Sequence, residues 1–169
     1  HQQGAKALLQ IHHGGWQALP DLNPNGEIFA PSAHAATDAK ALTDAQIRSI
    51  IAGYANAAEL ALQAGFDGVE IHGANNYLIQ QFFSAQSNQR SDEWGGSSEN
   101  RRRFVLAVYA EIRRQVGPHF PVAIKLNSAD FQRGGFSTED AKAVVEMLNP
   151  LEVDLVELSG GSYEAPAMH

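Results

Sequence analysis

Four short runs of apolar residues divide the chain at regular intervals. They cover residues 7–11, 68–72, 122–126 and 155–158, and each is rich in Val, Ile and Leu and bounded by polar or turn-forming residues. Runs of this length and composition are typical of buried β-strands. The pattern therefore predicts four strands.

Three longer stretches between these runs carry apolar residues at helical spacing. The first begins at Thr43, where Gln46 three residues later completes a capping-box pattern, and it ends near Gly65. The second covers residues 98–116. The third begins at Ser137 and ends at the Asn-Pro pair of residues 149–150. Each stretch predicts an amphipathic helix.

Strands that alternate with helices indicate an α/β fold with a parallel sheet. Both a doubly wound sheet and an arc of a (β/α)8 barrel fit this order. The connections after the first two strands, residues 12–42 and 73–97, are long and show no regular pattern. They follow the carboxyl ends of strands, where both architectures place their active sites. No Gly-x-Gly-x-x-Gly opens a helix, which argues against a dinucleotide-binding half.

Composition narrows the classes of function. The 169 residues are 44% hydrophobic and 18% charged, which is typical of a folded domain, and the formal net charge is −7. An acidic chain argues against nucleic acid or an anionic membrane as the main partner. The absence of cysteine excludes thiolate metal sites and Cys nucleophiles within these residues and fits a reducing cytoplasm. His12 and His13 lack a carboxylate at ligand spacing, so we expect no metal site.

The richest chemistry follows the second predicted strand, in the sequence His-Gly-Ala-Asn-Asn-Tyr of residues 72–77. His72 and Asn75 lie three residues apart in a turn and can direct two donors at one carbonyl oxygen. Tyr77 adds a phenol that can act as a general acid. Ordinary turn chemistry, in which these side chains satisfy backbone groups, explains the same residues equally well.

The residues that follow strengthen the functional interpretation. Residues 80–84 read Gln-Gln-Phe-Phe-Ser, residues 88–97 read Asn-Gln-Arg-Ser-Asp-Glu-Trp-Gly-Gly-Ser, and residues 99–104 read Glu-Asn-Arg-Arg-Arg-Phe. Together with residues 72–77, this series resembles the Old Yellow Enzyme family of FMN-dependent ene-reductases. The resemblance extends to all four predicted strands. It implies a TIM (β/α)8 barrel of which residues 1–169 are the central portion, about strands three to six, truncated at both ends.

The resemblance also implies roles for particular residues. Gln10 and Lys125 are expected to bind FMN, Gln10 at the pyrimidine edge and Lys125 beside N1 and C2=O. His72 and Asn75 would bind the substrate carbonyl, and Tyr77 would protonate the α-carbon. The implied reaction transfers hydride from NADH or NADPH, through the flavin, to the activated C=C of an enone, quinone or similar small molecule.

Several departures and alternatives accompany this interpretation. Asn76 stands where the family usually has Gly, Trp16 where many members have Arg, and Lys125 where the cation is often Arg. A barrel lyase that uses Lys125 as a Schiff base is one alternative, although the sequence shows no clear partner acid beside that residue. A barrel fragment without catalysis is another. We expect a cytoplasmic protein, and the sequence does not fix its oligomeric state.

Overall fold

Four strands form one parallel sheet in the order β1-β4-β5-β6. The computed structural model describes residues 1, 3–23 and 25–162. The strands are β1 (Leu8–Ile11), β4 (Gly68–Gly73), β5 (Val122–Asn127) and β6 (Leu155–Ser159). All four coincide with the runs predicted from the sequence.

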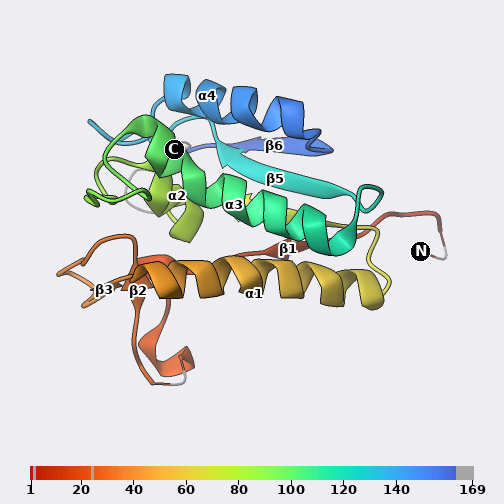
Figure 1. The fold of residues 1–169 in the computed structure, drawn as a ribbon, viewed down its shortest axis with the longest axis horizontal. Coiled ribbons are helices and arrows are strands. Elements are labelled where there is room, and N and C mark those ends of the chain that lie inside the picture. The colour runs from red at the N-terminus through yellow and green to blue at the C-terminus, as the bar shows by residue number, and fades with distance from the viewer. Residues whose placement is uncertain (2, 24, 163–169) are drawn as a thin grey trace.

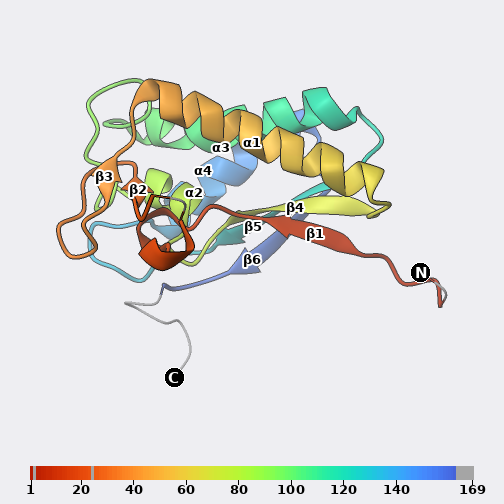
Figure 2. The same ribbon diagram turned by 90° about the horizontal axis from the view of Figure 1, so that it is seen from below.

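Three long helices connect the strands and lie on one face of the sheet (Figures 1 and 2). They are α1 (Asp44–Gln63), α3 (Ser98–Val116) and α4 (Thr138–Leu148), and a 3-10 turn, η3 (Asn149–Leu151), follows α4. The capping box predicted at Thr43 is present, because its hydroxyl accepts from the Gln46 backbone N–H and the Gln46 side chain accepts from the Thr43 N–H.

Strand order and helix placement distinguish the two architectures that the sequence allowed. Among β1, β4, β5 and β6, each strand pairs with the one that precedes it in the chain, and the helices cover a single face of this sheet. A doubly wound sheet reverses its strand order and places helices on both faces, whereas a barrel does neither. The chain therefore has the fold of an arc of a (β/α)8 barrel.

The two faces of the sheet differ in chemistry because successive strand residues point to opposite sides. Val69, Ile71 and Ile124 face the helices and are at most 1% exposed. The opposite face, called here the inner face, carries the polar side chains of Gln10, Glu70, His72, Lys125 and Glu157. Three register pairs, Gln10 with Glu70, His72 with Lys125, and Lys125 with Glu157, make these side chains neighbours.

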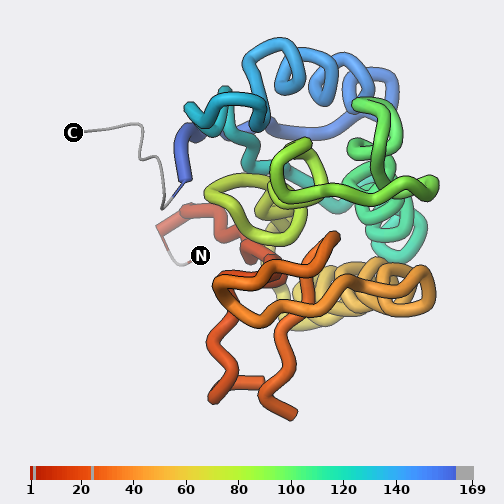
Figure 3. The backbone as a smooth tube through the Cα atoms, turned by 90° about the vertical axis from the view of Figure 1, so that its left-hand side faces the viewer, coloured from red at the N-terminus to blue at the C-terminus, as the bar shows by residue number. Residues whose placement is uncertain are grey.

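The two long connections contain more regular structure than the sequence predicted. Residues 12–42 include two 3-10 turns, η1 (Gly15–Gln17) and η2 (Pro20–Leu22), and two short paired strands, β2 (Phe29–Ala30) and β3 (Lys40–Ala41). In Figure 3 this segment projects away from the sheet beside the beginning of α1. The second connection contains α2 (Leu78–Phe83). These elements are too short for periodicity to reveal.

Candidate active site

The turn after β4 brings His72 and Tyr77 together. Asn75 and Asn76 have φ values of +56° and +61°, a left-handed conformation that Asn adopts more readily than most residues. Two such residues in succession reverse the chain sharply. As a result the Tyr77 ring lies with its centroid 5.0 Å from that of His72, at an interplanar angle of 67°. Asn76 therefore provides the turn for which the family usually employs Gly.

A third ring, that of His12, joins this pair from the end of β1. Its centroid lies 4.9 Å from that of Tyr77 and 6.0 Å from that of His72. The sequence indicated His12 as one member of a possible metal pair, and the resemblance placed it near the flavin without assigning it a role. Among the described residues, no group of three or more His, Asp or Glu side chains is arranged to hold a metal ion.

Helix α2 holds the segment that carries His12. The Leu78 backbone N–H donates to the His13 carbonyl at 3.0 Å, and the Trp16 backbone N–H donates to Gln81 Oε1 at 3.3 Å. The Gln81 amide in turn donates to the Asn76 carbonyl at 2.6 Å. Gln81, which is fully buried, thus ties this segment to the turn after β4. Sequence analysis assigned it no role beyond its place in the family motif.

The environment of His72 keeps its imidazole neutral. Burial, together with the nearby His12 and Lys125, lowers the pKa of His72 to about 4, against a smaller raising effect of Glu157. The residue is 7% exposed, and its Nδ1 atom is buried with no hydrogen-bond partner in the protein. A neutral imidazole has one N–H donor and one acceptor nitrogen, so it can form a hydrogen bond with a ligand without carrying a charge.

Asn75 is held between the ends of β5 and β6. Its backbone N–H donates to Asn127 Oδ1 at 3.3 Å, and its side-chain amide donates to Ser159 Oγ at 3.5 Å. Asn127 is fully buried and also donates to the Gly161 carbonyl at 2.7 Å. A side-chain amide has two N–H groups, so Asn75 keeps a donor for a ligand. The turn interpretation and the donor interpretation of Asn75 are compatible.

Gln10 and Lys125 lie on the inner face, and each is bonded to a carboxylate. Gln10 Nε2 donates to Glu70 Oε2 at 2.6 Å, and Lys125 Nζ donates to Glu157 Oε1 at 2.6 Å. The expectation that Lys125 has no partner acid was wrong. Glu157 lies 32 positions away in the sequence, and only the pairing of β5 with β6 makes the two neighbours.

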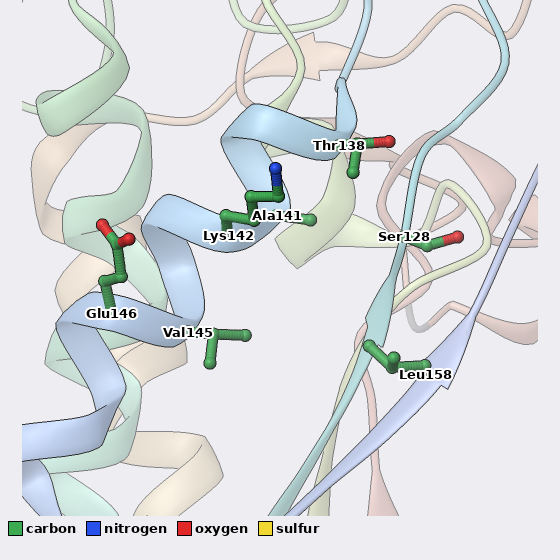
Figure 4. Close-up of a pocket in the computed structure, with 7 residues that line it drawn as sticks. All are labelled: Ser128, Thr138, Ala141, Lys142, Val145, Glu146 and Leu158. Carbon is green, nitrogen blue, oxygen red and sulfur yellow. The ribbon is translucent and has the colours of Figure 1, made fainter.

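The opposite side of the sheet contains a hollow with different properties. It has a volume of about 310 Å³ and lies between α4 and the ends of β5 and β6 (Figure 4). None of the predicted site residues lines it. Its lining is formed by Ser128, Thr138, Ala141, Lys142, Val145, Glu146 and Leu158.

No helix among the described residues is both long and apolar enough to cross a membrane.

Comparison with known sequences agrees with this arrangement. Residues 1–165 match the model of the NADH:flavin oxidoreductase / NADH oxidase family. The chain is 40% identical over 164 residues to a probable NADH-dependent flavin oxidoreductase of Bacillus subtilis (strain 168), an alignment that covers 93% of this chain and 44% of that protein. The chain therefore spans less than half the length of this relative.

Solved structures show the same fold. A 2-naphthoyl-CoA reductase in complex with 2-naphthoyl-CoA superposes with a TM-score of 0.90 at 29% identity, covering 99% of this chain and 28% of that one. An Old Yellow Enzyme homologue from Zymomonas mobilis superposes with a TM-score of 0.84 at 28% identity, covering 98% of this chain and 53% of that one.

Proposed function

Because the chain belongs to the NADH:flavin oxidoreductase / NADH oxidase family, we propose that the complete protein is an FMN-dependent oxidoreductase of the Old Yellow Enzyme type. It takes hydride from NADH or NADPH and delivers it to the activated C=C of an enone, quinone or related acceptor. The observation that carries the proposal is the cluster of His72, Tyr77 and His12 rings at the carboxyl ends of β4 and β1, beside Lys125.

In this proposal residues 1–169 contribute about strands three to six of an FMN-binding barrel. A complete (β/α)8 barrel takes about 250 residues, and the relatives are longer than this chain. The remaining strands would close the inner face. Lys125 is already only partly exposed, with 23% of its side-chain surface accessible.

The donors of the inner face fit the pyrimidine end of FMN. Gln10 and Lys125 each donate one hydrogen bond to a carboxylate, yet an ammonium has three N–H groups and a side-chain amide has two. Both residues therefore retain donors for the carbonyl oxygens and ring nitrogen at that end of the flavin. FMN, when bound, supplies the hydride that reaches the substrate. The positive charge of Lys125 favours the anionic reduced flavin.

His72 and Asn75 hold the carbonyl oxygen of the substrate. The neutral His72 ring and the Asn75 amide each donate one hydrogen bond to that oxygen, which draws electrons from the conjugated C=C and makes the β-carbon electrophilic. The lowered pKa keeps His72 neutral at physiological pH. Donation therefore needs no proton transfer from His72 to the substrate.

Tyr77 supplies the proton that completes the reduction. Its phenol hydroxyl donates a proton to the α-carbon after the β-carbon has received hydride, so the C=C bond becomes a single bond with one new hydrogen at each carbon. The rings of His12 and His72 flank that of Tyr77 and limit its movement. Positioning a proton donor in this way lowers the entropy cost of the transfer.

The Schiff-base alternative is less well supported. A lysine attacks a carbonyl only as the neutral amine, whereas the Lys125 ammonium is bonded to the Glu157 carboxylate at 2.6 Å. The Lys125 Nζ atom is therefore already engaged by a carboxylate. The proposal also includes a cytoplasmic location, which fits a reductase that consumes NADH or NADPH. The proposed partners of the enzyme are small molecules.

The test uses the purified complete protein. We expect a flavin absorbance spectrum, release of FMN on denaturation, reduction by NADH or NADPH under anaerobic conditions, and reoxidation by 2-cyclohexenone. Tyr77→Phe should slow reoxidation by the enone while FMN stays bound. A protein that binds no FMN, or that forms an irreversible adduct at Lys125 when a carbonyl substrate is added with borohydride, would overturn the proposal.

A further inference from the structure

The inner face contains two carboxyl groups, one buried and one exposed, that the proposed reaction does not use. Glu70 lies on β4 and is 9% exposed, while Glu157 lies on β6 with 46% of its side chain accessible. Burial of a carboxyl group costs free energy unless the group is paired. The hydrogen-bond partners of these two groups therefore indicate what they do.

Each carboxyl group holds one of the two residues expected to bind FMN. Glu70 accepts from the Gln10 amide, and Glu157 accepts from the Lys125 ammonium, both at 2.6 Å. Each carboxyl group also influences the pKa of the other across the intervening strand β5.

The two carboxyl groups differ in their electrostatic surroundings. Burial raises the pKa of Glu70, the Gln10 amide opposes that rise, and the neighbouring Glu157 adds to it. The Lys125 ammonium lowers the pKa of Glu157. The carboxyl group that faces the Lys125 ammonium directly, at 2.6 Å, is that of Glu157.

We propose that Glu70 and Glu157 are positioning residues for the flavin: Glu70 fixes the Gln10 amide, and Glu157 both fixes the Lys125 ammonium and moderates its charge. The inference rests on the proposed function, because it concerns the residues that would hold FMN. It assigns the pair two separable effects. Glu157 sets how strongly reduced FMN is preferred over oxidised FMN, and Glu70 sets how tightly FMN of either form is bound.

The first measurement is the ratio of the dissociation constants of oxidised and reduced FMN, determined anaerobically on the complete protein. Glu157→Gln keeps the shape and removes the charge that opposes Lys125. Reduced FMN should then be preferred about tenfold more strongly than in the parent, which corresponds to a midpoint potential about 30 mV higher. A merely structural loosening would weaken both forms, so it would not raise this ratio.

Three further variants complete the first measurement. Glu157→Asp keeps the charge and should leave the ratio close to that of the parent. The double variant Glu70→Gln with Glu157→Gln removes both carboxyl groups and should shift the ratio at least as far as Glu157→Gln alone. Glu146→Gln makes the same chemical change on α4, beside the hollow on the other side of the sheet (Figure 4), and should shift nothing.

The second measurement is the affinity for oxidised FMN. Glu70→Met removes the acceptor for Gln10 and should weaken the affinity about tenfold with little change in the ratio. Glu70→Gln restores an oxygen acceptor and should bring the affinity back toward that of the parent. Loss of affinity in both variants to the same extent would contradict the role of Glu70.

The outcomes separate this inference from the proposed function. A parent protein that binds no FMN overturns both. A parent that binds FMN, with a ratio that is unchanged or lowered in Glu157→Gln and in the double variant, overturns the inference alone. A raised ratio in Glu157→Gln, together with rescue of affinity by Glu70→Gln, supports it.

Discussion

The rings of His72 and Tyr77 meet edge to face, with centroids 5.0 Å apart, although four residues separate the two positions in the chain. This relationship depends on the left-handed conformation of Asn75 and Asn76. Under the proposed function, it brings the donor for the substrate oxygen and the proton donor into neighbouring positions, as reduction of a conjugated carbonyl compound requires.

The first prediction concerns the substrate oxygen. In the complete protein, His72→Ala or Asn75→Ala should slow reoxidation of the reduced flavin by 2-cyclohexenone, because loss of one such donor typically costs about 3 kcal/mol in the barrier. Stopped-flow absorbance measures the rate. His119→Ala removes an exposed histidine before β5 and serves as the control. A double variant of His72 and Asn75 that reoxidises at the parental rate would refute the assignment.

The second prediction concerns the charge of Lys125. Lys125→Met keeps most of the length and removes the ammonium, so the anionic reduced flavin loses a nearby cation. The midpoint potential should fall by about 30 mV or more, since 30 mV corresponds to about 1.4 kcal/mol for a two-electron couple. Lys142→Met, on the opposite side of the sheet, is the control. An unchanged potential with FMN still bound would exclude this role.

The third prediction concerns stability in acid. The pKa of His72 is about 4 in the folded protein, against an ordinary value of 6.5. Between these values the unfolded chain binds the additional proton, so the free energy of unfolding should decrease as the pH falls from about 6.5 to about 4, by up to about 1.4 kcal/mol per pH unit.

His72→Asn cannot bind that proton and should have a flatter dependence on pH. Urea unfolding of the complete protein at pH 7 and pH 5 measures the difference. Burial also lowers the pKa values of His12 and His13, so a residual slope is expected in the variant. Equal slopes in the parent and in His72→Asn would contradict the burial of an uncharged His72.

The fourth prediction concerns the segment that carries His12. Gly15 has a φ of +58°, and a Cβ there would lie 2.2 Å from Gln81 Oε1. Gly15→Ala should therefore lower the free energy of unfolding by about 2 kcal/mol or more, from backbone strain and from displacement of Gln81. Reoxidation by the enone should also slow, because the segment that positions His12 is displaced.

Gly53→Ala provides the matched control for that substitution. Gly53 lies in α1, and no atom lies within 4 Å of a Cβ built there. Alanine in place of an exposed helical glycine typically stabilises by about 0.5–1 kcal/mol. Chemical unfolding measures the free energy of unfolding of both variants. If Gly15→Ala lowers this free energy by no more than the amount by which Gly53→Ala changes it, the result would argue against the packing of Gly15 on Gln81.

The fifth prediction concerns residues 1–169 expressed alone. Strands β1 and β6 form the two edges of the four-stranded sheet, and Leu8, Leu155 and Leu158 on these strands are 40%, 55% and 67% exposed. Open edges with apolar side chains favour self-association. We expect oligomers by light scattering and weak binding of FMN by fluorescence quenching. A monomer that unfolds cooperatively and binds FMN at micromolar concentration would contradict the partial-barrel proposal.

Local signals in the sequence were sufficient for much of the fold. Strand and helix positions follow from apolar periodicity, and the helix starts at Thr43 and Ser137 follow from side chains that cap their own backbone. These are interactions between residues close in sequence, so the spacing of residue types records them. The same holds for His72 and Tyr77, whose approach depends on one short turn.

Other features depend on contacts between distant residues, and only the tertiary structure decided them. Helices on one face of a sheet in sequential order distinguish the barrel arc from a doubly wound sheet. The approach of His12 to Tyr77 depends on Gln81, and the pairing of Lys125 with Glu157 depends on the register of two strands. A shift of one residue in that register would turn Glu157 to the other face. Partnerships of this kind are set by the packing of whole elements, which no local pattern of residues specifies.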